Sequence, residues 1–151
     1  MLQHGSCAAR DGAGVLLLGP PGAGKSDLLL RLTGEGWNLV ADDQVLLRAE
    51  GGALLAAAPE SLRGMMELRG IGLMAGLAAA PEARLALVVD CVAPAAVPRL
   101  PEPARFEALG LALPRIALHA REASAPRKLL LALDALAGRI VCRAGALEAV
   151  P

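Results

Sequence analysis

Residues 15–26 read VLLLGPPGAGKS, and this stretch decides the fold. Its first part, residues 15–18, is a continuous apolar run, which is typical of a strand buried on both faces of a parallel or mixed sheet. The segment KSDLLLRLT, which begins at Lys25, places leucines at helical spacing, and Gly34 and Gly36 end that helix. The sequence therefore predicts a strand, a glycine loop and a helix in succession.

The loop matches the pattern GxxxxGK followed by Ser or Thr. Because it leaves a buried strand and opens a helix, its backbone N–H groups and the helix dipole converge on phosphate oxygens. The Lys25 ammonium would reach the terminal phosphates, and the Ser26 hydroxyl would ligate Mg²⁺. The same loop serves ATPases, GTPases, small-molecule kinases and protein kinases, so other residues must separate these classes. The residues of the loop are Gly19, Pro20, Pro21, Gly22, Ala23, Gly24, Lys25 and Ser26.

The composition indicates one domain with a buried core. Of the 151 residues, 55% are hydrophobic and 20% are charged, a balance far from that of disordered chains. The 15 Lys and Arg residues balance the 15 Asp and Glu residues, so no basic field favours nucleic acid or a membrane surface. With one Trp, one Phe and no Tyr, the chain lacks the stacking platforms that bind bases. Nucleic acid and membranes are therefore not expected as partners.

Targeting signals and cysteine chemistry are not visible either. The amino terminus has no secretory signal, and no apolar run reaches the roughly 20 residues of a membrane span, so we expect a cytoplasmic protein. Cys7, Cys91 and Cys142 are far apart and form no CxxC pair, which speaks against a disulfide framework or a zinc site. We expect all three to be small buried hydrophobes.

Short apolar runs separated by Gly and Pro predict an α/β fold, a single P-loop domain with a mixed sheet over residues 1–140 and a carboxyl-terminal tail at 141–151. In the first half we expect a strand at 37–41, a hairpin at 45–57 and loop with a short strand at 59–80. After these we expect a strand at 84–90, irregular chain at 94–103 and a short helix around Phe106 and Leu109. The last elements are a strand at 116–118 and a helix at 127–138 that starts near Ser124 and Pro126.

Acidic residues follow two of these predicted strands. Asp42 and Asp43 end the strand at 37–41, where a carboxylate could lie near a loop-bound phosphate and exchange a proton with an attacking hydroxyl. Successive strand side chains alternate faces, so only one of the two would point fully at the ligand. Asp90, which ends LALVVD, is a competing candidate for the metal-side carboxylate. Glu67 in ELRGIG offers a further carboxylate for Mg²⁺.

Together these segments resemble the HPr kinase/phosphorylase family, bacterial enzymes that phosphorylate a serine of the phosphocarrier HPr and remove that phosphate by phosphorolysis. Four segments carry the resemblance, which covers about half of the chain. They keep the order and spacing of the family pattern. They are His4-Gly5, GPPGAGKS, GEGWNLVADD at 34–43 and ELRGIG at 67–72.

The resemblance implies roles for individual residues. Asp43, supported by Asp42, would accept the seryl proton in phosphorylation. Ser26 and Glu67 would hold Mg²⁺, with ATP or pyrophosphate as donor. His4 and Lys25 would be further active-site groups. The resemblance also implies an HPr-like carrier as partner, a homo-hexamer, and a core similar to the nucleotide-binding portion of phosphoenolpyruvate carboxykinases.

The chain departs from the family pattern in three ways. It looks like the short form, which consists of the catalytic domain. Ala108 stands where the family has an Arg, with Arg105 as the nearest substitute. HAREASAPRK at 119–128 replaces the family's Arg/Pro/Gly-rich loop for dephosphorylation, which favours the kinase direction. A small-molecule P-loop kinase and a non-catalytic ATP-sensing module are the alternative functions.

Overall fold

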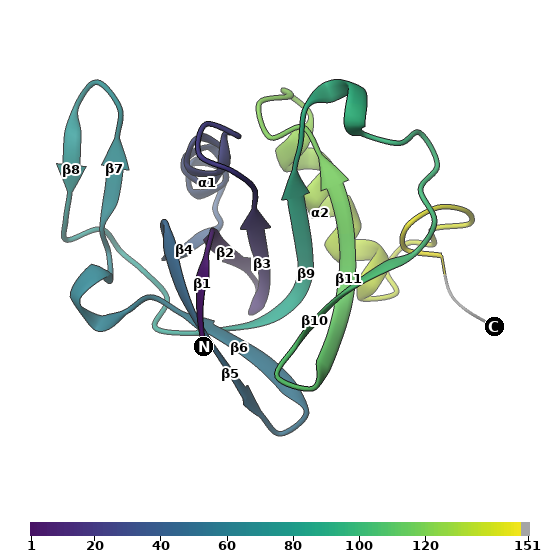
Figure 1. Cartoon of the computed structure of the whole chain (residues 1–151), viewed down its shortest axis with the longest axis horizontal. Helices are drawn as coiled ribbons and strands as arrows, with labels where there is room; N and C mark the ends of the chain where they lie inside the picture. Colours follow the sequence, from purple (N-terminus) through teal and green to yellow (C-terminus); the bar gives the residue numbers. More distant parts are fainter. Residues whose placement is uncertain (149–151) are drawn as a thin grey trace.

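The computed structural model describes residues 1–148, which form a nine-stranded mixed sheet with two helices against one face (Figure 1). The strand order is β1-β5-β6-β9-β3-β2-β4, and β11 also pairs with β9 and carries β10. The predicted α/β fold with a mixed sheet is therefore confirmed. The strands of this sheet are β1 (Leu2–His4), β2 (Ser6–Arg10), β3 (Ala13–Leu18), β4 (Asn38–Ala41), β5 (Gln44–Glu50), β6 (Ala53–Ala57), β9 (Ala83–Cys91), β10 (Ala104–Ala108) and β11 (Leu111–Leu118).

The centre of the sheet is parallel, and its geometry positions the glycine loop. β3 and β9 run parallel, and β11 runs parallel to the other edge of β9. β4 runs antiparallel to β2, which runs antiparallel to β3, so β4 points the same way as β3. The carboxyl ends of β3, β4, β9 and β11 therefore meet at one edge, where ligands bind in open α/β sheets.

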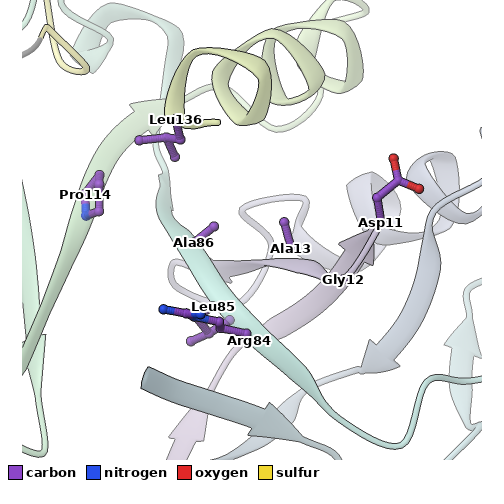
Figure 2. A pocket seen from close by; sticks show the side chains of 8 residues that line it. All are labelled: Asp11, Gly12, Ala13, Arg84, Leu85, Ala86, Pro114 and Leu136. Atoms are coloured by element: carbon purple, nitrogen blue, oxygen red, sulfur yellow. The ribbon is translucent and has the colours of Figure 1, made fainter. Parts of the chain in front are cut away.

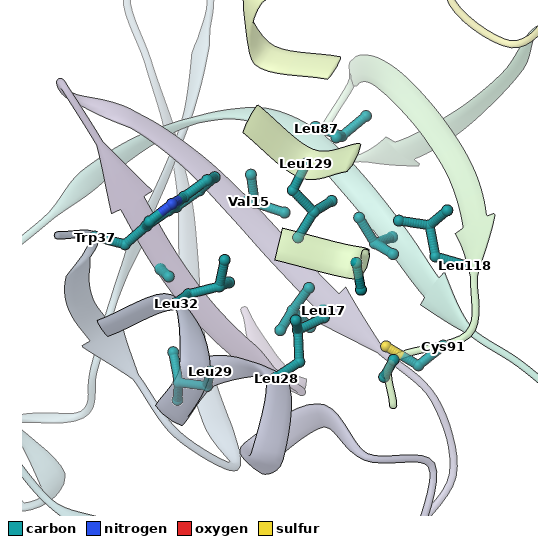
Figure 3. Packing of buried hydrophobic residues seen from close by; sticks show 14 of the residues in the cluster. Val15, Leu17, Leu28, Leu29, Leu32, Trp37, Leu87, Cys91, Leu118 and Leu129 are labelled. Atoms are coloured by element: carbon teal, nitrogen blue, oxygen red, sulfur yellow. The ribbon is translucent and has the colours of Figure 1, made fainter. Parts of the chain in front are cut away.

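Two hydrophobic layers hold the sheet, one on each face, because side chains alternate along a strand. Val15 and Leu17 of β3 join the layer under the helices, whereas Leu16 and Leu18 join the opposite layer. The helices are α1 (Lys25–Gly34) and α2 (Ala125–Leu136). Figure 3 shows leucines of α1 and Leu129 of α2 packed against β3 and β9.

Most of the expected elements are present within a residue or two. The helix that follows the glycine loop begins at Lys25 and ends at Gly34. β5 and β6 form the predicted hairpin and turn at Gly51 and Gly52. β9 matches the strand expected at 84–90, and α2 matches the helix expected after Ser124. Trp37 precedes β4 rather than starting it, and packs in the layer under the helices.

Three expectations were wrong or incomplete. The predicted short helix around Phe106 and Leu109 does not form: Phe106 lies in β10, and Leu109 lies in the turn to β11. Strand pairing with β11 is favoured over a helix here, because it buries Phe106 in the hydrophobic layer on the face opposite the helices. The last strand is much longer than 116–118 and includes Pro114, which precedes the parallel ladder with β9 and so removes none of its hydrogen bonds. Cys142 is half-exposed, unlike the buried Cys7 and Cys91.

The segment at 59–80 contains more structure than one short strand. A two-stranded hairpin of β7 (Met66–Leu68) and β8 (Gly72–Met74) projects from the domain and is separate from the main sheet (Figure 1). Short 3-10 turns occur at Glu60–Leu62 and, in the proline-rich segment, at Pro94–Ala96.

The predicted tail is only partly visible, because residues 149–151 lie outside the described part. Leu147 packs against the layer under the helices, so the described part of the tail contacts the domain. Neither α1 nor α2, the α-helices of residues 1–148, has the length and apolar content of a membrane-spanning helix.

Candidate phosphate-binding site

The glycine loop adopts a backbone that side chains would obstruct. Gly19, at the end of β3, has a φ of 150°, and a Cβ there would lie 2.9 Å from the Cys91 carbonyl oxygen. Gly24 has a φ of 94° and directly precedes α1. The first backbone N–H groups of the helix therefore follow the glycine loop directly. Those N–H groups have no partner within the helix and are suited to phosphate oxygens.

Lys25 is held within the loop by backbone carbonyls. Its Nζ donates to the carbonyl oxygens of Gly19, at 2.6 Å, and Pro20, at 3.0 Å. The ammonium therefore already sits over the concave side of the loop. Cys91 lies beneath it, and burial raises the pKa of that thiol to about 11 although the nearby Lys25 charge acts in the opposite direction. The Cys91 thiol next to the loop is therefore protonated at neutral pH.

Ser26 and Asp42 are brought into direct contact. The Ser26 hydroxyl donates to Oδ1 of Asp42 at 2.8 Å, which joins the first turn of α1 to the end of β4. The same Oδ1 accepts a hydrogen bond from the Ser6 hydroxyl at 2.9 Å. A serine hydroxyl beside a carboxylate is a set of hard oxygen donors of the kind that Mg²⁺ prefers.

Asp43 lies next to this pair on an exposed left-handed elbow. Its φ is 68°, a conformation that Asp tolerates better than most residues. The elbow is tied to the amino-terminal segment: Gly5 N–H donates to the Asp43 carbonyl at 3.0 Å, and His4 pairs with Gln44 across β1 and β5. The structure therefore brings His4, Asp42, Asp43 and Ser26 to one place although they are distant in sequence.

Asp90 is engaged elsewhere. Arg115 of β11 donates to both of its carboxylate oxygens, at 2.6 and 2.9 Å, and its guanidinium lies 5.7 Å from the centre of the Phe106 ring. These hydrogen bonds raise the pKa of Arg115. Because Ser26 bonds to Asp42 and Asp90 is paired with Arg115, Asp42 is the better candidate for the metal-side carboxylate.

Glu67 is not joined to the loop. It is exposed on β7, and no hydrogen bond or ion pair links it to the glycine loop within the described residues. In residues 1–148 no group of three or more His, Cys, Asp and Glu side chains is arranged to hold a metal ion. Ala108 lies in β10 next to the turn to β11, away from the carboxyl ends of the parallel strands.

Sequence reasoning missed Arg121, which lies against the glycine loop. A Cβ on Gly24 would be 3.1 Å from Cγ of Arg121 and 3.2 Å from Cβ of Ala120. Arg31 of α1 holds this segment, since its guanidinium donates to the carbonyls of Ala120 and, at 3.2 Å, of Glu122. The exposed Arg121 makes no ion pair within the described chain. Only the contact between the start of α1 and the loop after β11 reveals it.

Two grooves lie at the other end of the sheet. Figure 2 shows one of about 450 Å³, lined by residues near the start of β3 and β9 and by Leu136 of α2. An overlapping groove of about 600 Å³ runs along α2. The glycine loop thus presents a backbone surface at the sheet edge and is separate from both grooves.

A buried strand, a left-handed glycine loop and a helix whose serine contacts a carboxylate from a neighbouring strand define an α/β P-loop domain. The HPr Serine kinase C-terminal domain family matches residues 1–89, more than half of the chain. The chain belongs to this family.

Individual proteins support this assignment. The chain is 40% identical over 95 residues to the HPr kinase/phosphorylase of Geobacillus thermodenitrificans. This alignment covers 58% of this chain and 30% of that protein. It is 48% identical over 73 residues to the HPr kinase/phosphorylase of Leptothrix cholodnii, covering 48% of this chain and 22% of that protein. The chain therefore spans less than a third of the length of these relatives.

A solved structure agrees over most of the fold. The Hpr(Ser) kinase/phosphatase from Coxiella burnetii superposes with a TM-score of 0.74 at 27% identity, covering 92% of this chain and 95% of that one.

Proposed function

We propose that this chain is an ATP-dependent serine kinase that phosphorylates a seryl residue of an HPr-type phosphocarrier protein. The observation that carries the proposal is the hydrogen bond between Ser26 of the phosphate loop and Asp42, with Asp43 exposed beside it. Family membership supports the choice of a protein substrate.

Asp43 is proposed as the proton acceptor. Its side chain is exposed and so accessible to the hydroxyl of a docked protein. As the seryl oxygen attacks the γ-phosphorus, its proton passes to the Asp43 carboxylate, and the bond from that phosphorus to the β,γ-bridging oxygen breaks to release ADP. Asp42 is proposed to support Asp43 rather than to accept the seryl proton, since the hydroxyls of Ser6 and Ser26 donate to its Oδ1 and hold its carboxylate against Ser26.

The residues around Ser26 fit a divalent cation. Ser26 and Asp42 supply oxygen atoms alone, and Asp42 Oδ2 accepts no hydrogen bond from the described residues. Ser26 is proposed to hold Mg²⁺ together with Glu67 of the β7–β8 hairpin, although no hydrogen bond or ion pair joins Glu67 to the loop within the described residues. The bound ion would neutralise charge on the phosphate oxygens.

Cationic side chains supply the remaining charge stabilisation. Lys25 is proposed to exchange its hydrogen bonds to the loop carbonyls for the terminal phosphates, while the loop N–H groups bind the phosphate oxygens. Arg121, exposed beside Gly24, is proposed as a further cation for the polyphosphate. His4 is proposed to assist at the Asp43 elbow, to which β1 attaches it. We also propose a hexameric assembly on the resemblance stated above, and the cytoplasmic location that we expected from the sequence remains a proposal.

The test is transfer of radiolabelled γ-phosphate from ATP to a purified HPr-like carrier in the presence of Mg²⁺. Asp43→Asn is expected to abolish phosphoserine formation and to keep nucleotide binding, because the amide cannot accept the proton. Asp11→Asn is the matched control, since Asp11 is also exposed with a positive φ of 49° but lies in the turn before β3.

Phosphoserine formed by Asp43→Asn at the wild-type rate would remove Asp43 from the reaction. Labelling of small acceptors in place of every carrier would indicate a small-molecule kinase. Bound ATP that stays intact with all acceptors would indicate a sensor. Adding inorganic phosphate to the labelled carrier measures the reverse step in the same assay.

A further inference from the structure

Ser6 is the only polar or charged residue that is buried in the described chain, at 1% exposure. It lies on β2 directly before Cys7, Ala8 and Ala9, which are apolar and buried. Its backbone is fixed, because Ser6 pairs with Leu17 in the ladder between β2 and β3. A buried hydroxyl is costly unless it is hydrogen-bonded, so its partners indicate its role.

Those partners are the two aspartates of the candidate site. The Ser6 hydroxyl donates to Asp42 Oδ1 at 2.9 Å and accepts from the Asp43 N–H at 3.5 Å. One side chain therefore bridges the carboxylate of Asp42 and the backbone of Asp43. The Gly5 N–H, which donates to the Asp43 carbonyl at 3.0 Å, anchors the same elbow from the adjacent residue.

We propose that Ser6 is a positioning residue, whose buried hydroxyl holds Asp42 against Ser26 and fixes the left-handed elbow that presents Asp43. Ser26 is exposed at the start of α1, and its hydroxyl proton needs an acceptor when its oxygen binds a cation. Asp42 Oδ1 is that acceptor at 2.8 Å. Because the Ser6 and Ser26 hydroxyls both donate to Oδ1, they fix the orientation of the Asp42 carboxylate. Its Oδ2 would then be available to accept a hydrogen bond from water at the cation site.

The expected effect of Ser6 on phosphotransfer rests on the proposed function, whereas its hydrogen bonds to Asp42 and Asp43 do not. Partners of metal-site ligands typically change metal affinity or activity by about 10- to 100-fold when they are removed. Ser6 reaches the proposed metal ligand Ser26 only through Asp42, because both hydroxyls donate to the same Oδ1, so we expect the lower end of that range.

Three variants separate positioning from packing. Ser6→Ala removes the hydroxyl and adds no volume. Ser6→Thr keeps the hydroxyl. Cys7→Ala is the matched control, because Cys7 is equally buried on the same strand but its thiol donates to the Ala8 carbonyl and not to either aspartate. Thermal unfolding of each variant establishes that it is folded before the other measurements.

Binding of the fluorescent analogue mant-ATP is measured with Mg²⁺ and with EDTA. The ratio of the EDTA Kd to the Mg²⁺ Kd is the metal gain, the factor by which Mg²⁺ tightens binding. In Ser6→Ala we expect the metal gain to fall about tenfold. The Kd for mant-ATP measured in EDTA should stay within about twofold of wild type. For phosphotransfer, kcat should fall about tenfold while KM for ATP changes less than about twofold. Ser6→Thr should recover most of both losses.

A ligand-free readout keeps this test independent of the proposed function. Amide hydrogen exchange at Asp43 and Gln44 should quicken in Ser6→Ala and not in Cys7→Ala. Unchanged exchange and an unchanged metal gain in Ser6→Ala would overturn the inference, as would an equal loss in Cys7→Ala. A wild-type protein that shows the exchange protection but phosphorylates no carrier would instead refute the proposed function alone.

Discussion

Replacing Gly24 with alanine is expected to harm the phosphate loop more than replacing Gly22 in the same way. Both residues have a positive φ, 94° and 83°, so the backbone cost of an L side chain is similar, roughly 1–2 kcal/mol. They differ in their surroundings. A Cβ at Gly24 would lie 3.1 Å from Arg121 Cγ and 3.2 Å from Ala120 Cβ, whereas at Gly22 nothing lies within 4 Å.

The extra cost at Gly24 depends on whether these neighbours can move. Arg121 is exposed and its side chain can turn away. Ala120 is fully buried, and its carbonyl accepts a hydrogen bond from Arg31, so it cannot yield as easily. Overpacking of this kind costs about 1–3 kcal/mol. We therefore expect Gly22→Ala to lose about 1–2 kcal/mol of unfolding free energy and Gly24→Ala about 2–5 kcal/mol.

Urea unfolding of the two variants measures this difference, and a double variant apportions it. Arg121→Ala combined with Gly24→Ala should recover less than half of the extra loss, because the Ala120 contact remains. Equal losses at Gly22 and Gly24 would refute the reasoning. So would complete recovery by Arg121→Ala, which would mean that Ala120 moves freely.

Two further predictions follow from the surrounding contacts. Asp90→Asn should leave the Mg²⁺-dependent affinity for mant-ATP within about twofold of wild type, because Arg115 engages Asp90, whereas Asp42→Asn should lower it about tenfold or more; equal effects would reinstate Asp90 as the metal-side carboxylate. Burial raises the thiol pKa of Cys7 to about 12 and of Cys91 to about 11, so the folded protein holds protons that the unfolded chain releases above about pH 9. The unfolding free energy should be intact below pH 9 and fall as the pH rises through 11, which urea titrations at several pH values measure; a flat profile would contradict the burial of these thiols.

Local sequence predicted the elements that carry the loop. The apolar run before Gly19 and the leucine spacing after Lys25 are short-range signals, and both elements formed with nearly the expected bounds. The β5–β6 hairpin was equally predictable, because two adjacent glycines supply the turn. The expected helix around Phe106 failed because strand pairing between β10 and β11 is a tertiary contact that local spacing does not encode.

The candidate site divides in the same way. The motifs identified Lys25, Ser26, Asp42 and Asp43 as candidates, but they could not decide between Asp42 and Asp90. That choice required the hydrogen bonds of Ser26 to Asp42 and of Arg115 to Asp90. Arg121 had no motif at all, since only the packing of the loop after β11 against Gly24 brings it to the phosphate loop.

The sequence by itself determined the phosphate loop, the class of fold and the family, because these depend on residues that are close in the chain and on turn chemistry. Only the tertiary structure decided which carboxylate meets Ser26, that Ser6 joins both aspartates, and that Arg121 borders the loop. Each of these contacts joins residues from different strands and helices. Their proximity follows from the order and register of the sheet, which the local pattern of residues does not specify.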